Sequence, residues 1–278
     1  PPYGVDVKAA QDSVKPESAQ FPNGRFGHGL PPVSDGQMLF LTHLASKMRA
    51  PNEGGGRAGI VLNGSPLFNG AAESGPSEIR RSLLESDLVD AIVALPTNMF
   101  FNTGIATYIW ILDNTKTPER KGKVQLIDAT SFWTKLRKNL GAKGREIGEA
   151  DREQIVKLYD NFAETEHSKT FDIKDFGYWT ITVERPLLDE DGKPITDAKG
   201  RSKPDPKLRD SENVPFTYDG AIDAYFKAEV LPYVPDAWID EKRTKVGYEI
   251  PFTRHFYKYV PPRPVAEIDA ELEAQVGK

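Results

Sequence analysis

The first four residues, Pro1-Pro2-Tyr3-Gly4, combine residue types that could cradle a planar base. Proline fixes its own backbone angle and lacks an amide hydrogen, so two in a row form a stiff segment with carbonyl groups free to accept. The ring of Tyr3 follows directly, and an aromatic ring can stack on a nucleobase that has left a duplex. Because Pro-Pro-Tyr is also common in ordinary loops, the tetrapeptide alone favours a loop without function.

A second aromatic pair, Phe100-Phe101, lies in a short segment between two apolar runs. Neighbouring side chains of an extended segment point to opposite sides, so both rings cannot enter one core. One ring is expected either to face a cleft at the sheet edge, where α/β proteins bind ligands, or to pack on a nearby element. The sequence does not distinguish these alternatives, nor does it tell which ring would face a ligand.

Apolar patterns predict the elements that would position these rings. Residues 1–33 are predicted to be loop, and a helix is predicted from Ser34, with Gln37 completing a capping box. The run 58–62 is apolar on both faces, which predicts a strand inside a parallel sheet. The buried stripe of the first helix is predicted to be Met38, Leu41, Ala45 and Met48; a second helix is predicted at 76–84, and further strands at 88–95, 106–112 and 123–128.

The segment 96–105 is too short to hold a crossover helix. The strands on either side of it should therefore run antiparallel or lie apart. This order predicts an α/β fold, the second half of a doubly wound sheet whose last hairpin is reversed.

The later half of the chain shows a different pattern, which predicts a mixed α+β extension. Residues 187–214 are polar, with turn signals at Asp191-Gly192 and Lys199-Gly200, and are predicted to be an exposed insertion. The other predicted elements are helices at 151–162, 221–230 and 265–276, a strand at 178–185 and an extended, proline-rich stretch at 257–264.

Composition argues against several classes of protein. The 278 residues carry a formal net charge of −5, whereas a protein that binds nucleic acid by itself normally has a basic surplus. The absence of cysteine and the four scattered histidines argue against disulfides and metal sites. Apolar runs are far shorter than the about 20 residues that span a bilayer, and no signal peptide is recognisable, so we expect no membrane contact and a cytoplasmic location.

One glycine pattern, Gly54-x-Gly56-x-x-Gly59, matches the dinucleotide-binding fingerprint. That fingerprint must follow a strand and open a helix, whereas this stretch follows a predicted helix and enters a predicted strand. A turn is therefore predicted here, and no cofactor-binding residue is assigned.

Several long blocks, in one order along nearly the whole chain, resemble one family. They are residues 1–4, 34–44, 55–70, 79–105, 127–133, 175–187, 230–240 and 247–264. The chain resembles the modification subunit of type I restriction-modification systems, which are adenine-N6 DNA methyltransferases of bacteria and archaea.

The resemblance implies roles for the residues that could cradle a base. Pro1, Pro2 and Tyr3 match the last three positions of the family's catalytic loop, an Asn or Asp followed by Pro-Pro and Tyr or Phe. The carbonyl next to Pro1 and the residue that precedes Pro1 in the family would accept hydrogen bonds from the adenine amine, and Tyr3 would stack on the flipped ring. Phe100 or Phe101 occupies the place of an aromatic on the other side of the base.

The resemblance also implies a cofactor and partners. The cofactor would be S-adenosyl-L-methionine, whose glycine-rich loop lies upstream of the matching part, so the chain is expected to be a fragment that is inactive alone. Residues 1–135 would form the second half of a Rossmann-like catalytic domain and 136–278 an extension. Partners would be double-stranded DNA with a flipped adenine, a DNA specificity subunit, a second modification subunit and a restriction subunit.

The tail helix 265–276 would bind a partner through a short apolar seam or dock on the chain itself. The alternative function is a non-catalytic scaffold that binds a protein partner through the proline-rich stretch 259–264 and this helix.

Overall fold

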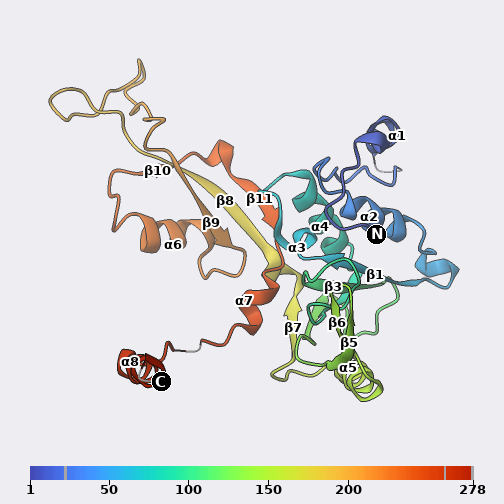
Figure 1. Cartoon of the computed structure of the whole chain (residues 1–278). Helices are drawn as coiled ribbons and strands as arrows, with labels where there is room; N and C mark the ends of the chain where they lie inside the picture. The colour runs from blue at the N-terminus through green and yellow to red at the C-terminus, as the bar shows by residue number, and fades with distance from the viewer. Residues whose placement is uncertain (22–23, 260, 277–278) are drawn as a thin grey trace.

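The structure is a computed structural model that describes residues 1–21, 24–259 and 261–276 (Figure 1). A five-stranded mixed sheet forms its centre, with helices packed on both faces. The mixed α/β class is therefore confirmed, as are the four strands predicted between residues 58 and 128. Across the sheet the order is β1 (Arg57–Asn63), β3 (Thr107–Asp113), β2 (Val89–Ala94), β4 (Lys123–Asp128) and β7 (Ser168–Asp172).

Strand directions place three carboxyl ends at one edge of this sheet. Strand β3 runs antiparallel to both β1 and β2, and β4 runs parallel to β2. The antiparallel β2–β3 pair confirms the prediction from the short connection. The prediction of a parallel-sheet interior for 58–62 is wrong, because β1 pairs antiparallel with β3 and lies at the sheet edge within the described residues, where Arg57 and Gly59 are exposed.

Two helices cover one face of the sheet. These are α2 (Gln37–Ser46) and α4 (Gly75–Glu85), which carries proline in its first turn, and both confirm the predicted helices. The predicted capping box is wrong, because α2 begins at Gln37 after Gly36 and Ser34 makes no cap. Their apolar residues share a core with β1 to β4 that contains Met38, Leu41, Leu62, Ile79, Leu83, Ile92, Trp110, Leu112 and Leu126.

The first 33 residues are not all loop, as predicted. They contain a 3-10 turn (Lys8–Ala10) and α1 (Gln11–Ser18), which includes Pro16. Helix α1 buries no side chain, so the sequence offered no apolar periodicity to reveal it. Glu17 in its last turn accepts a hydrogen bond from the backbone N–H of Arg25 at 3.1 Å, which closes the segment on itself.

The C-terminal part forms a second sheet around β8 (Gly177–Glu184). Strand β9 (Asp210–Pro215) pairs with one edge of β8, and β10 (Trp238–Ile239) and β11 (Lys245–Tyr248) with the other. The predicted insertion ends earlier than residue 214, because β9 supplies its last residues; Gly192 and Gly200 do form turns, both with φ near +78°. Shorter elements are α6 (Ala221–Tyr225), a π-helical turn (Phe226–Val230), a 3-10 turn (Glu241–Arg243) and α7 (Phe252–Phe256).

The second sheet docks on the first through β11. Arg80 of α4 is fully buried, and its Nε donates to the carbonyl of Tyr248 at 2.6 Å. The backbone N–H of Glu73 donates to the carbonyl of Val246 at 3.0 Å. These contacts join the two sheets. The predicted division into domains 1–135 and 136–278 stays a prediction.

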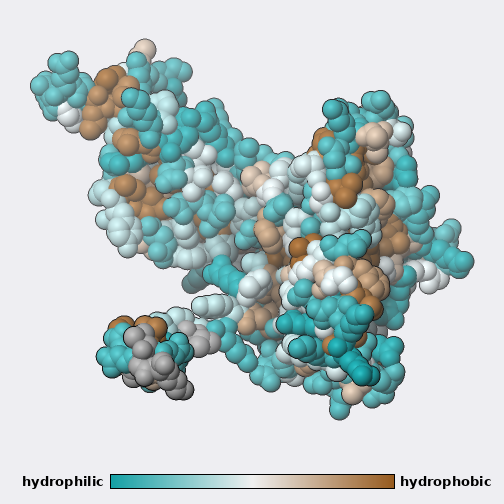
Figure 2. All heavy atoms as spheres, viewed as in Figure 1, coloured by the Kyte–Doolittle hydropathy of each residue, from teal (hydrophilic) through white to brown (hydrophobic). Residues whose placement is uncertain are grey.

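The tail ends in α8 (Val265–Val276), as predicted. Figure 1 shows α8 standing away from the rest of the molecule, and Figure 2 shows apolar atoms on its surface. Val265 and Leu272 are exposed. Of the predicted extended stretch 257–264, residue 260 lies outside the described residues.

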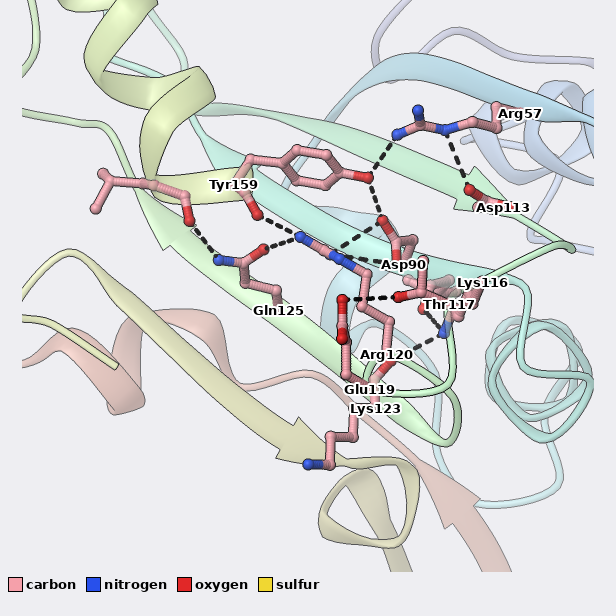
Figure 3. Close-up of polar contacts among 12 residues, drawn as sticks. Arg57, Asp90, Asp113, Lys116, Thr117, Glu119, Arg120, Lys123, Gln125 and Tyr159 are labelled. Carbon is pink, nitrogen blue, oxygen red and sulfur yellow. Dashed lines mark hydrogen bonds and ion pairs between the residues drawn. The ribbon is translucent and has the colours of Figure 1, made fainter. Parts of the chain in front are cut away.

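A buried polar network fixes α5 (Glu149–Asn161) on the other face of the sheet (Figure 3). Asp90 of β2 is 1% exposed, and Arg120 donates to its two carboxylate oxygens at 3.2 and 3.4 Å. The Arg120 guanidinium also lies over the rings of Tyr159 and Phe162, 4.3 and 4.2 Å from their centroids. Tyr159 donates its hydroxyl proton to Asp90, and Gln125 of β4 binds the carbonyl of Leu158 at 2.9 Å.

This network predicts a pH dependence of stability at alkaline pH. Burial, and then the hydrogen bond to Asp90, raise the pKa of Tyr159 from 10.0 to about 12. The folded state therefore holds this proton more tightly than the unfolded state, so the contribution is complete below pH 10 and is lost as pH rises through 12. Tyr159→Phe should lower the free energy of unfolding at pH 8 by about 1.5–3 kcal/mol, the range for a hydrogen bond to a charged group.

The deficit of Tyr159→Phe should shrink between pH 10 and 11.5, measured by urea unfolding. Tyr233→Phe is the matched control, since Tyr233 is exposed and makes no side-chain hydrogen bond within the described residues. A deficit that stays constant with pH would contradict the assignment.

Candidate active site

Three segments follow the carboxyl ends of β1, β2 and β4 at the same edge of the sheet. They are α3 (Ser65–Phe68), the loop 96–105 and the hairpin formed by β5 (Thr134–Leu140) and β6 (Lys143–Glu146). The register confirms the shared edge, because Asn63 lies opposite Thr107 and Ala94 lies opposite Tyr108. Ligands of open α/β sheets bind at such an edge, so this is where a site is expected.

The N-terminal segment is fixed beside the start of α2. The backbone N–H of Val7 donates to the carbonyl of Val33 at 2.8 Å, and that of Gly36 to the carbonyl of Val5 at 3.3 Å. A Cβ atom at Gly36 would lie 2.0 Å from Cγ1 of Val7, so only glycine allows this approach. Gly4 has a φ of +60°, which turns the chain sharply after Tyr3.

The structure brings Tyr3 and Phe100 together. Their ring centroids lie 6.1 Å apart with 67° between the ring planes, an edge-to-face contact. Burial raises the pKa of the Tyr3 phenol. Pro1 and Pro2 are exposed, and their carbonyl groups accept no backbone hydrogen bond from the described residues. The segment therefore offers free acceptors next to two aromatic rings.

Phe101 lies differently from its neighbour. It is 59% exposed, and Nζ of Lys143 lies 5.6 Å from its ring centroid. The two phenylalanines therefore have different surroundings. Phe100 contacts Tyr3, whereas Phe101 faces β6.

The loop 96–105 is held by the β5–β6 hairpin. Asn98 adopts a φ of +59°, a conformation that Asn tolerates better than most residues. Its carbonyl accepts from the backbone N–H of Gly144 at 3.0 Å, and its Nδ2 donates to the carbonyl of Ala142 at 3.1 Å. The backbone N–H of Ala142 donates to the carbonyl of Phe101 at 2.9 Å. These bonds fix the loop that carries Phe100.

A polar cluster that was not predicted from the sequence lies at the end of β1. Nε2 of Gln37 donates to Oδ1 of Asp35 at 2.8 Å, and Oε1 of Gln37 accepts from the backbone N–H of Asn63 at 2.9 Å. The hydroxyl of Ser65 donates to Asp35. Gln37 is buried, so it joins α2 to β1 instead of capping its own helix. Its position on an otherwise apolar helix face was the signal that could have revealed this.

The Tyr3–Phe100 contact leaves no room for a planar ring between the two side chains. Rings stacked on both faces of a base must lie about 7 Å apart, since each contact needs about 3.5 Å. Tyr3 and Phe100 are closer than this and steeply inclined, so the two rings would have to separate and rotate before a base could lie between them.

The glycine-rich stretch 54–59 does not have the structure of a nucleotide-binding loop. Gly54 and Gly55 have φ values of +95° and +66°, and they form a turn between a 3-10 helix (Pro51–Glu53) and β1. A glycine-rich loop that holds a nucleotide cofactor follows a strand and opens a helix. The predicted turn is confirmed, and no residue of this chain is assigned to the cofactor.

Comparison with known proteins identifies the family. The family model described as N-6 DNA Methylase matches residues 1–184. The chain belongs to the N-6 DNA methylase family. This confirms the resemblance inferred from sequence, and the N-6 DNA methylase match includes the Pro1–Tyr3 segment and the loop 96–105.

The relatives of this N-6 DNA methylase chain are type I methylase subunits. It is 28% identical over 184 residues to the type I restriction enzyme MjaIX methylase subunit of Methanocaldococcus jannaschii, covering 66% of this chain and 30% of that protein. It is 30% identical over 136 residues to the HindI methylase subunit of Haemophilus influenzae, covering 49% and 27%.

A solved structure agrees with these sequence matches. The type I restriction-modification methyltransferase subunit of Streptococcus thermophilus matches with a TM-score of 0.50 and 26% identity, covering 63% of this chain and 34% of that one. The chain spans about a third or less of the length of these relatives. No helix among the described residues is long and apolar enough to cross a membrane.

Proposed function

We propose that this chain is the part of a type I modification subunit that holds the target adenine while its N6 amine is methylated. The observation that carries the proposal is the contact between the rings of Tyr3 and Phe100, which are 97 positions apart in the sequence. Both residues lie within the family match. S-adenosylmethionine is the proposed methyl donor. The fold assignment that goes with it is the second half of a Rossmann-like methyltransferase sheet with a reversed last hairpin.

Each part of the site has a proposed role in this reaction. Tyr3 and Phe100 stack on the flipped adenine, which offsets much of the few kcal/mol that flipping costs. The adenine amine is a poor nucleophile because its lone pair is delocalised into the ring. The carbonyl next to Pro1 and the residue before it accept hydrogen bonds from that amine and favour a more tetrahedral nitrogen. The rigid Pro1-Pro2 segment fixes the direction in which these acceptors point toward the amine.

Methyl transfer by the full-length subunit, assembled with its specificity subunit, tests this function. Wild type should place the methyl group on adenine N6, identified by mass spectrometry of digested DNA. Phe100→Ala should lower kcat/KM by about 5- to 150-fold, because stacking contributes about 1–3 kcal/mol per base. Phe101→Ala is the matched control and should change kcat/KM by less than about threefold.

Methylation at a position other than adenine N6 would contradict the proposed reaction. Equal losses for Phe100→Ala and Phe101→Ala would contradict the assignment of Phe100 to the base.

We also propose that α8 binds a partner subunit and does not dock on its own chain. Its apolar residues Val265 and Leu272 are exposed, and an exposed apolar seam on a helix suits packing against a partner helix. The DNA specificity subunit is the proposed partner, and assembly would bring in the second modification subunit and the restriction subunit.

Deletion of residues 264–278 should therefore abolish assembly with the specificity subunit on a sizing column. Val265→Ser/Leu272→Ser should weaken assembly, whereas Glu267→Gln, a change on the same helix that removes no apolar contact, should not. Unchanged assembly after the deletion would contradict the proposal.

A further inference from the structure

The β5–β6 hairpin is strongly basic although the whole chain is acidic. Its residues 134–146 contain five Lys or Arg and one acidic residue, while the formal net charge of the chain is −5. A segment with this excess is a candidate contact for a polyanion. The five basic residues are Lys135, Arg137, Lys138, Lys143 and Arg145.

These charges are not neutralised inside the chain. None of the five forms an ion pair within the described residues. Lys135 and Arg145 are directly opposite each other in the hairpin, a cross-strand arrangement of like charges that is destabilising. Lys135, Arg137 and Lys138 are exposed. Repulsion between these like charges therefore destabilises the hairpin, and a bound anion would offset that repulsion.

The basic residues lie next to the candidate active site. Nζ of Lys143 lies over the ring of Phe101, and Arg145 donates to Oγ1 of Thr97 at 3.0 Å, so β6 contacts the loop that carries Phe100. Arg145 also stacks on Trp133, with its guanidinium carbon 3.9 Å from the ring centroid. In Figure 1 the hairpin lies beside α5, below β3, and Figure 2 shows mostly hydrophilic atoms there.

The hairpin is also held in place at both ends. Phe132 before β5 and Ile147 after β6 pack in the core beneath α5, with Val93, Ile127 and Ile155. Helix α5 itself is fixed by the Asp90–Arg120 network. Because the hairpin is already held in place, binding an anion through its cations does not cost the entropy of ordering a loop.

We propose that the β5–β6 hairpin binds the phosphate backbone of the DNA strand next to the flipped adenine. This inference rests on the proposed function. Flipping rotates one nucleotide out of the duplex about its backbone, and cations beside the base pocket would hold the flanking phosphates. Lysine and arginine contacts to phosphate position a protein without reading sequence, so the hairpin would act equally at every target site.

A protein partner fits the hairpin less well than DNA. Protein interfaces generally have an apolar, charge-poor centre. Leu140 is the large apolar residue of the hairpin that is exposed, whereas three basic residues and Glu146 are exposed in the same hairpin.

The salt dependence of DNA binding by the full-length subunit with its specificity subunit tests the inference. In the triple variant Lys135→Gln/Arg137→Gln/Lys138→Gln, the slope of log K against log salt should become less steep by about 2–3, since each phosphate contact contributes about −0.9. At 0.1 M salt the same rule predicts an affinity loss of about 60- to 500-fold. The probe is a duplex with the target site, titrated between 0.05 and about 0.3 M salt.

The matched control is Lys193→Gln/Lys199→Gln/Lys207→Gln, which removes the same charge from exposed residues of the 187–214 segment. It should leave the slope within about 0.5 of wild type. A hairpin variant with the slope of this control would overturn the inference. So would a hairpin variant that loses its specificity subunit on a sizing column, since the hairpin would then be a protein interface.

Failure of the hairpin proposal and failure of the proposed function give different results. If the wild-type protein binds DNA but does not methylate adenine, the proposed function is contradicted. The salt slopes of the hairpin variant and the wild type can still be compared. Wild type that methylates adenine while the hairpin variant keeps the wild-type slope would contradict only the hairpin.

Discussion

Tyr3→Ala in the full-length subunit should lower kcat/KM for adenine methylation by about 5- to 150-fold, the effect of losing about 1–3 kcal/mol of stacking. The structure gives Tyr3 one aromatic neighbour, Phe100, at 6.1 Å. Removing the Tyr3 ring leaves one face of the flipped base without a partner, so the flipped state should be less populated. The loss should therefore appear in a methyl-transfer assay and in the fluorescence of 2-aminopurine placed at the target position.

Tyr3→Phe is the matched control for this prediction. It keeps the ring and removes only the hydroxyl group, so kcat/KM should stay within about threefold of wild type. Wild-type activity in Tyr3→Ala would contradict the base-binding role of Tyr3. If kcat/KM falls as much in Tyr3→Phe as in Tyr3→Ala, the hydroxyl group and not the ring would be the part of Tyr3 that matters.

Arg120→Ala should lower the free energy of unfolding by about 3–5 kcal/mol, the cost of leaving a buried charge without its partner. Asp90 is 1% exposed, and Arg120 is the cation that contacts its carboxylate most directly. The same change removes the cation between the rings of Tyr159 and Phe162. Because this network fixes α5, the hairpin before α5 should also become less ordered.

Urea unfolding followed by tryptophan fluorescence measures this effect, since Trp110 is fully buried in β3. Arg81→Ala is the matched control; Arg81 pairs with Glu78 and Glu85 on the surface of α4, and such pairs contribute about 0.3–0.5 kcal/mol. The double variant Asp90→Asn/Arg120→Gln should lose less than Arg120→Ala, because it leaves no unpaired charge. Equal losses in Arg120→Ala and Arg81→Ala would contradict the structural role.

The elements that could be predicted from sequence are those whose burial repeats with a regular period. Leu41 and Met38 lie on one buried stripe of α2, and Val89–Ala94 is buried throughout, so pattern and structure agree. Helix α1 could not be predicted because it buries no side chain. The neighbours of β1 could not be predicted either, since an apolar run gives burial but not the direction of the paired strand.

The sequence could nominate Tyr3, Phe100 and Phe101 as candidate site residues, and their role at a base stays a prediction. It could not give their geometry, because only the fold shows that Tyr3 contacts Phe100 while Phe101 faces Lys143. That choice depends on the hydrogen bonds between the loop 96–105 and the β5–β6 hairpin, which join residues about 45 positions apart. Such long-range contacts leave no periodic signal in the sequence.

Photo-cross-linking of the target base tests the central claim most directly. A duplex with 5-iodouracil in place of the target adenine, bound to the full-length subunit with its specificity subunit and irradiated, should form adducts that peptide mass spectrometry places on Tyr3 or Phe100. Phe101 should carry no adduct, and Tyr3→Ala should shift the yield to Phe100. Adducts that avoid both Tyr3 and Phe100 would contradict the claim that these two rings hold the flipped adenine.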